Sequence, residues 1–382
     1  MVKRGALSGI TVLDLSRLLP GPYCSMILAD HGARVISLED KKFLAEGHFV
    51  QLLNRNKEHI SLNLKTEEGK KIFFQIARKA DVILEQFRPG VVERLGVDYD
   101  TVKNINPRII YCSITGYGQT GPYKNRVGHD ANYLSIAGVL DLIGNKNQPP
   151  SIPGVQIADI AGGGMNAAIG ILLALQSREK TGKGQYVDIS MTDGMVGLLP
   201  VALFFHQLTG LFPERGDNML SHRYACYNTY ETADGKYLTL GAVETRFWKN
   251  ICEKMGVPEY IPYQYDDQKR AEIIHFFRTK IAEKTLQEWT RELGEMELCW
   301  SPVNNLSEAI QDPHLRERKM FVDVTDHKGA TTTTLGIPIK LSETPGSIQR
   351  EPDQFGQSTE QVLKEFGYSQ EEIQVFRAND VI

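Results

Sequence analysis

Short hydrophobic segments alternate with amphipathic ones along the first half of the chain. Runs rich in branched residues predict strands at residues 10–15, 33–38, 59–64, 81–84, 108–113 and 186–190. Helical spacing predicts helices over 22–30 and 66–80, the second opened by Thr66 with acidic residues in its first turn. Strands that alternate with helices indicate an α/β fold, with a parallel sheet covered on both faces.

The pattern changes near residue 222. Two strand-like segments, 224–232 and 236–243, flank Ala233-Asp234-Gly235, which is typical of a hairpin turn. Helical spacing follows over 245–254 and 267–282, and again around 360–366 and 370–378. We therefore expect a large α/β domain over 1–221, a smaller α+β domain over 222–330, and a linker with C-terminal helices over 331–382.

Composition excludes several classes of function. A chain of 382 residues is long enough for two hydrophobic cores. Its net charge of −4 gives no electrostatic reason to expect nucleic acid or a membrane as partner. Five scattered cysteines predict neither a disulfide framework nor a zinc site. Because the N-terminus lacks a signal-peptide pattern, we expect a cytoplasmic protein. The apolar stretch 195–205 is about half of the ~20 residues of a membrane span, so we predict a buried helix there.

Several catalytic motifs are missing from the sequence. The segment after the first strand lacks the G-x-G-x-x-G turn of dinucleotide enzymes, which argues against a dehydrogenase. Thr181-Gly182-Lys183-Gly184 precedes a strand and lacks the phosphate-loop spacing, so we interpret it as a surface turn. The sequence contains no G-x-S-x-G, no H-E-x-x-H and no clustered carboxylates, and we predict no metal site.

Asp159 is the most informative residue of the chain. It lies just ahead of Gly162-Gly163-Gly164 and a long apolar stretch that predicts a helix. Glycines permit close approach of a substrate, and free N–H groups at a helix start favour negative charge. We therefore expect these glycines to offer backbone donors beside a reactive carboxylate.

Two other ionisable residues are candidates for the same site: His129 in Gly128-His129-Asp130, and Glu244 after the second hairpin strand. Their spacing does not show that they meet. Taken singly, His129 is equally consistent with a capping or structural residue, and Glu244 with a cap of the helix that starts at Thr245.

Many short motifs, in order, resemble those of the family III CoA-transferases (CaiB/BaiF), which include the α-methylacyl-CoA racemases. The resemblance runs from about Leu7 to Ile382. The matching segments are Leu7–Asp14, Pro20–Tyr23, Leu28–Ala33, Asn54–Lys57, Phe87–Gly90, Ile114–Gly118, Thr181–Gln185, Gly356–Thr359 and Gly367–Ser369. It implies a Rossmann-like large domain, built from both ends of the chain, and a smaller domain. It also implies an interlocked dimer, with the active site between the large domain of one subunit and the small domain of its partner.

The resemblance implies two alternative chemistries. In the transferases, the Asp matching Asp159 attacks an acyl-CoA thioester and carries CoA to a second carboxylic acid. In the racemases, that Asp and a His matching His129 exchange the C2 proton of a 2-methylacyl-CoA, with a Glu matching Glu244 beside the His. An acid and a base on opposite sides of C2 suffice for racemisation. The surroundings of His129 and Glu244 favour the racemase pattern.

Departures from the racemase pattern keep the transferase alternative open. Arg223 and Arg246 stand where the racemases usually carry other residues, and two arginines near an acyl site suit a substrate with a second carboxylate. The alternative is that both point to solvent or pair structurally. A third hypothesis, a non-catalytic acyl-CoA-binding subunit of a heteromer, is disfavoured by the presence of Asp159.

For the CoA nucleotide, the resemblance makes Arg88 the first candidate and assigns Gly116 to the same cleft. Arg55 and Lys57 are further candidates to neutralise phosphates. We expect no permanently bound cofactor, with CoA entering as part of the substrate. The expected partners are an acyl-CoA thioester, a carboxylic acid acceptor for a transferase, and a second copy of the chain, with heteromeric pairing as the alternative.

Overall fold

The computed structural model describes residues 5–46, 51–325 and 331–382. The described chain forms two compact units. Unit 1 contains residues up to 139, 153–199 and 319–382, and unit 2 contains 140–152 and 200–318. The passage into the second unit falls at Pro200, ahead of residue 222, where the strand pattern of the sequence changes.

Unit 1 is built on a six-stranded sheet in which every strand runs parallel to its neighbours. The strand order is β3-β2-β1-β4-β5-β6. The strands are β1 (Thr11–Asp14), β2 (Arg34–Glu39), β3 (Lys57–Ser61), β4 (Val82–Glu85), β5 (Ile110–Thr115) and β6 (Tyr186–Ser190). The prediction of a parallel α/β fold is confirmed. In this order the chain reverses its direction of winding between β1 and β4, where the loops after the strands diverge and leave a crevice for a ligand.

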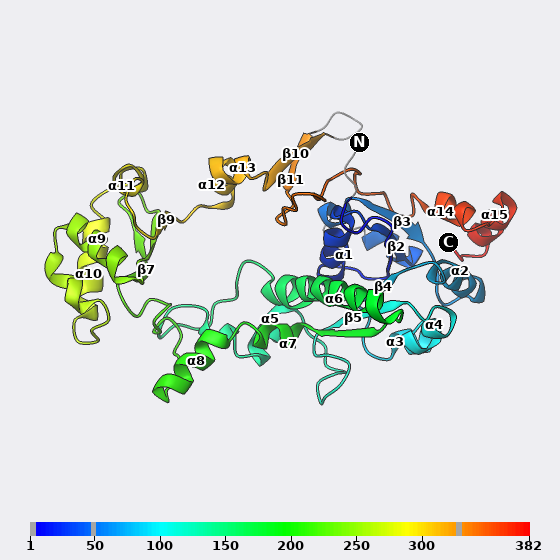
Figure 1. The fold of residues 1–382 in the computed structure, drawn as a ribbon, viewed down its shortest axis with the longest axis horizontal. Helices are drawn as coiled ribbons and strands as arrows, with labels where there is room; N and C mark the ends of the chain where they lie inside the picture. The colour runs from blue at the N-terminus through cyan, green and yellow to red at the C-terminus, as the bar shows by residue number, and fades with distance from the viewer. Residues whose placement is uncertain (1–4, 47–50, 326–330) are drawn as a thin grey trace. The chain divides into compact units, whose positions relative to one another are not determined.

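Helices surround this sheet, as Figure 1 shows. Those of unit 1 are α1 (Pro20–Asp30), α2 (Glu67–Ala77), α3 (Val91–Leu95), α4 (Tyr99–Ile105), α5 (Asp130–Ile136), α6 (Asn166–Thr181), α7 (Met191–Val196), α14 (Thr359–Glu365) and α15 (Gln370–Ala378). The Thr66 hydroxyl accepts the N–H of Gly69 at 3.0 Å, which confirms the predicted cap of α2. Unit 1 also holds two short 3-10 helices, Lys41–Glu46 and Gln51–Asn54, and the antiparallel hairpin β10 (Phe321–Thr325) and β11 (Thr331–Leu335).

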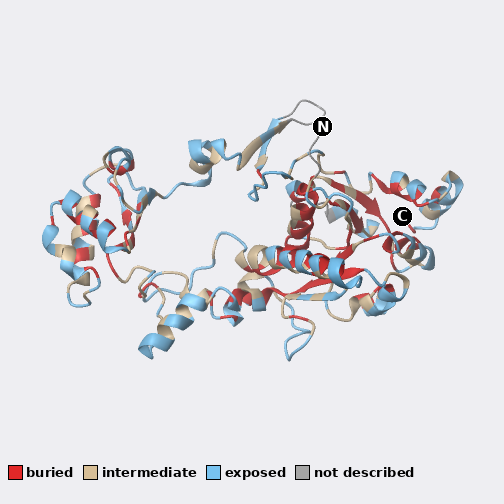
Figure 2. Ribbon diagram, viewed as in Figure 1, coloured by how far each residue is buried: buried red, intermediate tan, exposed pale blue. Residues whose placement is uncertain are grey.

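The core of unit 1 joins both ends of the chain. Strands β4 and β5 are buried at every position, and Figure 2 shows the burial concentrated on the sheet. Val362 and Leu363 of α14 and Ile373 of α15 belong to the same buried cluster as Phe73 of α2. Apolar burial therefore fixes the C-terminal helices to the unit that the N-terminal strands begin.

A π-helix, Ala158–Met165, runs directly into α6. Together they form one apolar helix of 24 residues. Among the described residues, this is the one helix that is long and apolar enough to cross a membrane. Half of its most apolar window is buried inside the protein, and the core helices of soluble proteins meet the same criterion. Its length and composition are therefore weak evidence for a membrane span.

Unit 2 contains an antiparallel sheet in the order β7-β8-β9, formed by β7 (Tyr227–Glu231), β8 (Tyr237–Gly241) and β9 (Trp300–Pro302). The predicted hairpin is confirmed, with Gly235 in its turn at φ +71°. The helices are α8 (Pro200–Thr209), α9 (Thr245–Met255), α10 (Arg270–Ile281), α11 (Leu286–Leu293), α12 (Leu306–Gln311) and α13 (Pro313–Glu317), with 3-10 turns at Leu140–Leu142 and Pro258–Tyr263. Its core centres on Trp248, Phe277 and Trp289.

The helix predicted to be buried over 195–205 is not buried. Helix α7 ends at Val196, α8 begins at Pro200, and within the described chain no residue of α8 is buried. Its large side chains Leu203, Phe204 and Leu208 are 53%, 56% and 67% exposed. The prediction was wrong for the single chain because no described part of that chain covers this apolar helix.

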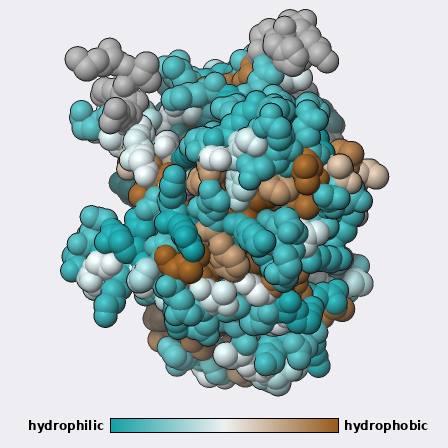
Figure 3. All heavy atoms as spheres, turned by 90° about the vertical axis from the view of Figure 1, so that its right-hand side faces the viewer, coloured by the Kyte–Doolittle hydropathy of each residue, from teal (hydrophilic) through white to brown (hydrophobic). Residues whose placement is uncertain are grey.

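One face of unit 1 is largely hydrophilic. Figure 3 shows the face that carries α2, α14 and α15, where hydrophobic side chains form only small separate areas. Such an arrangement is normal for a surface in contact with water.

Candidate active site

Asp159 is the second residue of the π-helix, so the helix begins before this carboxylate and not after the glycines. This overturns the expectation that Gly162–Gly164 supply free N–H groups of a helix start. The orphan N–H groups belong to the first turn, around Asp159 itself. Segments of π-helix occur frequently at functional sites.

The three glycines have a packing role. A Cβ on Gly162 would lie 2.7 Å from the Met191 carbonyl oxygen of α7, and one on Gly164 would lie 2.9 Å from the Pro20 carbonyl oxygen of α1. Any larger residue would push these helices apart. The glycines therefore hold the π-helix between α1 and α7 and fix the position of Asp159.

The surroundings of Asp159 suit acid–base chemistry. Its backbone N–H donates to Asp130 Oδ1 at 3.0 Å. Burial, with a smaller contribution from the Asp130 carboxylate, raises the pKa of Asp159 to about 6, while His129 opposes this rise. A carboxyl group with such a pKa changes charge near neutral pH, where a general base is most effective.

His129 lies at the start of α5, next to Asp130, and its side chain is exposed. Its backbone N–H donates to Asn132 Oδ1 at 2.9 Å. Because His129 acts on the pKa of Asp159, the structure brings these two predicted residues within electrostatic reach, although 29 positions separate Asp130 from Asp159 in the chain.

Tyr133 is a site residue that sequence reasoning missed. It is 6% exposed, and its hydroxyl donates to the Gly128 carbonyl at 2.5 Å. Burial, then the Asp159 carboxylate, raise the pKa of Tyr133. A Cβ on Gly116 would lie 2.4 Å from its ring, so Gly116 leaves room for Tyr133. The available signal was its position one helical turn after His129, which places both on one side of α5.

Glu244 belongs to unit 2. It occupies the N-cap position of α9, but its side chain accepts no cap hydrogen bond from that helix, and it is exposed. Burial raises the pKa of Tyr265, and the charge of Glu244 adds to this rise; the Tyr265 hydroxyl donates to the Val243 carbonyl at 2.6 Å. Glu244 therefore presents its carboxylate at the end of β8, and the simple capping role does not apply.

Arg223 and Arg246, considered as carboxylate-binding residues, both have protein partners. Arg223 forms a two-pronged contact with Asp267, both Nη2 distances being 2.8 Å, and Arg246 pairs with Glu297 at 3.2 Å. This arrangement favours structural pairing for both and weakens the argument they gave for a dicarboxylic substrate.

A small apolar cavity of about 260 Å³ lies at the carboxyl edge of the sheet, beside the point where the strand order reverses. Its walls include Leu15 after β1, Leu38 of β2, Leu62 after β3 and Phe87 after β4. At its rim the guanidinium of Arg17 and the ammonium of Lys42 lie 3.6 Å and 4.4 Å from the centre of the Phe43 ring, and they pair with Glu39 and Asp40, which also line the cavity. The apolar walls suit a nucleobase, whereas both rim cations are already engaged.

Arg88 lies directly after Phe87 and is exposed, with no ion pair in the described part of the chain. Its charge also reaches Tyr133, where it opposes the rise in pKa. The loop of Phe87 and Arg88 therefore extends from the apolar cavity toward the surroundings of Asp159.

Arg55 and Lys57 are placed differently from the sequence prediction. Arg55 is 3% exposed and donates to both carboxylate oxygens of Asp30, at 3.0 Å and 2.7 Å. Lys57 is 1% exposed, its Nζ lies 3.0 Å from the Pro22 carbonyl, and burial lowers its pKa to about 8. Interior cations with protein partners are unsuited to bind a phosphate, so this placement argues against both predicted contacts.

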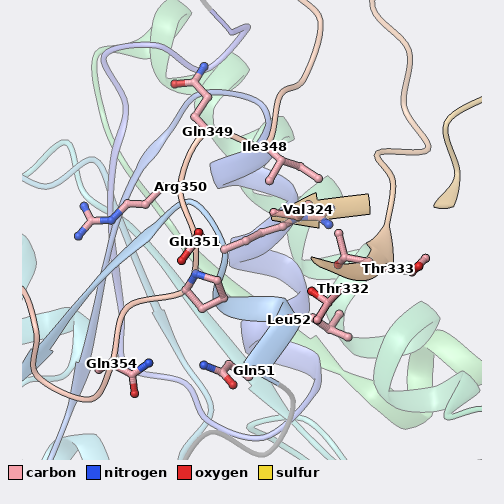
Figure 4. A pocket seen from close by; sticks show the side chains of 13 residues that line it. Gln51, Leu52, Val324, Thr332, Thr333, Ile348, Gln349, Arg350, Glu351 and Gln354 are labelled. Atoms are coloured by element: carbon pink, nitrogen blue, oxygen red, sulfur yellow. The ribbon is translucent and has the colours of Figure 1, made fainter. Parts of the chain in front are cut away.

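A larger cavity of about 600 Å³ lies between Leu52, the β10–β11 hairpin and the segment Ile348–Gln354. Figure 4 shows Leu52, Thr332 and Thr333 together on one side, with the Arg350 guanidinium extended away from them. That guanidinium donates to Asp353 Oδ1 at 2.6 Å. The lining of this cavity is mostly polar, so it suits an adenine ring less well than the apolar cavity beside Phe87. Among the described residues no cluster of His, Cys, Asp or Glu is arranged to hold a metal ion.

The fold is a doubly wound parallel α/β sheet, with Asp159 and His129 near each other and an apolar cavity at the carboxyl edge of the sheet. Residues 7–359 match the model of CoA-transferase family III. The chain belongs to this family and is an enzyme of its type. The family resemblance predicted from the motifs is thereby confirmed.

Relatives of both chemistries match the chain. It is 35% identical over 378 residues to alpha-methylacyl-CoA racemase of Homo sapiens, covering 99% of this chain and 97% of that protein. It is 34% identical over 364 residues to succinyl-CoA:mesaconate CoA-transferase of Haloarcula marismortui, covering 89% and 91%. A CaiB/BaiF family protein from Brucella suis superposes with a TM-score of 0.83 at 27% identity, covering 95% of this chain and 100% of that one.

Proposed function

We propose that this protein is an acyl-CoA racemase or epimerase that exchanges the C2 proton of a 2-methylacyl-CoA. The observation that carries the proposal is the hydrogen bond from the Asp159 N–H to Asp130, the residue after His129, which brings His129 within electrostatic reach of a carboxyl group whose pKa is raised to about 6. A transferase needs only the carboxylate, whereas proton exchange between two faces needs both an acid and a base. The similarity to a racemase over nearly the whole chain supports the same choice.

The proton transfers follow from these two groups. The Asp159 carboxylate takes the C2 proton from one face, and the electron pair of the C–H bond moves into the thioester to form an enolate. The imidazolium of His129 then gives a proton to the opposite face of C2 and becomes neutral. In the reverse direction the two residues exchange roles. The N-terminal end of the long helix adds a favourable dipole for the enolate charge.

We propose that CoA binds along the carboxyl edge of the sheet. Its adenine would occupy the apolar cavity lined by Phe87, and Arg88 would contact the phosphates. Gly116, which leaves room for Tyr133, would shape the cleft beyond them. Arg88 and Asp159 both act electrostatically on Tyr133, so the two residues lie on the same side of the site. A CoA whose phosphates contact Arg88 would therefore extend its thioester toward Asp159.

We also propose that the active form is a homodimer. Within the described chain, α6 exposes Leu173 to 66% and α8 exposes Leu208 to 67%, and Leu211 and Phe212 after α8 are exposed to 74% and 77%. So much exposed apolar surface is typical of a subunit interface. We retain Glu244 as the proposed partner of His129, supplied by the second subunit. A light-scattering mass equal to one chain at micromolar concentration would contradict this assembly.

The alternative is a CoA-transferase. Asp159 would attack the thioester carbonyl and displace the CoA thiolate to give a mixed anhydride, and the thiolate would then attack the aspartyl carbonyl, which releases the donor acid as its carboxylate and leaves CoA as an aspartyl thioester. An acceptor carboxylate would take the CoA by the same two steps in reverse. The nearly equal identity to a succinyl-CoA:mesaconate CoA-transferase favours this alternative. The pairing of Arg223 with Asp267 disfavours it.

The deciding experiment incubates the protein with 2-methylacyl-CoAs in deuterated water, with and without free carboxylic acids, and follows products by mass spectrometry. We expect one deuterium to enter at C2 without any acceptor. His129→Ala should abolish this exchange, and the exposed His314→Ala should leave it unchanged. Exchange at the wild-type rate in His129→Ala would eliminate the racemase mechanism. Transfer of CoA to an added acid without deuterium would establish the alternative.

A further inference from the structure

Glu85 is a buried carboxyl group that the proposed chemistry does not use. It is the last residue of β4 and is 1% exposed. Its Oε2 accepts the backbone N–H of Phe87 at 2.7 Å. The side chain thus closes a short turn at the point where β4 passes into the loop that contains Phe87 and Arg88.

The residues after Glu85 connect this turn to the proposed CoA site. The Gln86 side chain accepts the N–H of Gly21 at 3.0 Å, which joins the loop after β4 to the start of α1. Phe87 forms part of the wall of the 260 Å³ cavity, and Arg88 is exposed beyond it. A shift of the Phe87 backbone would therefore move both an apolar wall and a cation.

The charge of Glu85 is uncompensated. Among the described residues, no Lys or Arg forms an ion pair with it. Burial raises the pKa of Glu85 to about 7, although the Ser113 side chain and the Phe87 N–H oppose this rise. The titratable groups that face it from α3, β5 and β6 are acidic or weakly acidic: Glu93, Tyr111, Cys112, Tyr186 and Asp188. A buried carboxyl group without a cation is costly, and such a cost persists where the group has a function.

We propose that Glu85 is a positioning residue for CoA binding, which holds Phe87 and Arg88 in their binding arrangement through the N–H of Phe87. This inference rests on the proposed CoA site and deepens it. Because an ionised carboxylate accepts an N–H more strongly than a neutral carboxyl group does, the arrangement is held best when Glu85 is ionised.

The test measures the dissociation constant of free CoA by calorimetry, so that it does not depend on which reaction the enzyme catalyses. Glu85→Leu removes the hydrogen-bond acceptor and replaces it with an apolar side chain of similar size. We expect it to weaken CoA binding about tenfold, since one charge-assisted hydrogen bond is lost. Glu93→Gln, an exposed neighbour on α3, is the matched control and should bind CoA as the wild type does at pH 8.

Glu85→Gln supplies a second test if the leucine variant fails to fold, because an amide still accepts the N–H but does not ionise. The ratio of its dissociation constant to that of the wild type cancels the titration of CoA itself. We expect a ratio near one at pH 6 and about fivefold weaker binding than wild type at pH 8, where wild-type Glu85 is ionised. The transition should fall near pH 7.

The outcomes separate this inference from the proposed function. Wild-type affinity in a folded Glu85→Leu protein, or a ratio that does not change between pH 6 and pH 8, would overturn the role of Glu85 and leave the CoA site intact. A wild-type protein that does not bind CoA would overturn the proposed function, and this inference with it.

Discussion

Two neighbouring strands of the same sheet each end in a buried carboxyl group that accepts a backbone N–H. One of the two carboxyl groups has a cation nearby, and the other has none among the described residues. At the end of β1, Asp14 is 1% exposed and accepts the N–H of Ser16 at 2.9 Å. At the end of β4, Glu85 is 1% exposed and accepts the N–H of Phe87 at 2.7 Å. Asp14 has the buried Lys57 at 3.7 Å, whereas the described chain offers Glu85 no cation.

The comparison extends to a second pair of carboxylates. Asp30 forms a buried two-pronged ion pair with Arg55, while among the described residues His129 is the one basic group that acts on the pKa of Asp159. Removing one partner of a buried ion pair leaves the other charge unpaired in the interior and strongly destabilises the fold. A buried carboxyl group without a cation has a raised pKa and responds to pH in the neutral range. The paired set is therefore structural, and the unpaired set is suited to binding and catalysis.

The largest expected effect comes from breaking the strongest pair. Asp30→Ala leaves the buried Arg55 guanidinium without its carboxylate, and we expect a loss of about 4 kcal/mol in unfolding free energy. Urea unfolding followed by circular dichroism measures it. A loss below about 1 kcal/mol would show that Arg55 finds another partner or water.

Lys57→Met tests the other paired carboxylate in the same way. It leaves Asp14 buried with only neutral donors such as the Ser25 hydroxyl, so we expect a loss of about 3 kcal/mol. The conservative Lys57→Arg keeps the charge and is the control for packing. Equal stability of the methionine variant and the wild type at pH 7 would remove the distinction between the two strand ends.

Glu85→Gln should have the opposite sign, because it removes a charge that the fold disfavours. Folding raises the pKa of Glu85 from 4.5 to about 7, so ionisation lowers wild-type stability as the pH rises through this window. We expect the variant to be more stable by about 2 kcal/mol at pH 8. At pH 4 both proteins carry a neutral group, and the difference in unfolding free energy should vanish. A variant less stable than wild type at pH 8 would refute this assignment.

The smallest effect on stability is expected at Asp159, which is partly exposed. Its pKa is raised from 3.8 to about 6, so Asp159→Asn should stabilise the protein at pH 8, by about 1 kcal/mol after solvent screening. The same variant should lose C2 exchange entirely. In the wild type, kcat/KM for removal of the proton by Asp159 should fall below about pH 6, as the base becomes protonated. An acid limb at pH 4 would contradict the raised pKa.

The local pattern of the sequence predicted most of the fold. All six strands of the parallel sheet and the hairpin around Gly235 were found, because each depends on hydrophobic periodicity within a few residues. The predicted Thr66 cap was correct for the same reason. The errors occurred where burial depends on other parts of the chain, as in α8, which is apolar but uncovered within the described chain.

The candidate site was predictable only in part. Asp159 was found from its place before three glycines, but those glycines proved to be packing positions inside a helix. The only signal for Tyr133 was its position one helical turn after His129, and Glu85 gave no signal that distinguishes it from an ordinary strand residue. Arg55 and Lys57 looked like surface cations in the sequence, yet both are interior.

The sequence by itself determined the order of strands and helices, the family and the candidate carboxylate Asp159, because these depend on short-range periodicity and on residue type. Only the tertiary structure decided which charges are compensated. Asp30 meets Arg55 across 25 positions, and Asp130 meets the backbone of Asp159 across 29. The charge state of a carboxyl group depends on burial and on its neighbours in space, which the order of residues along the chain does not specify.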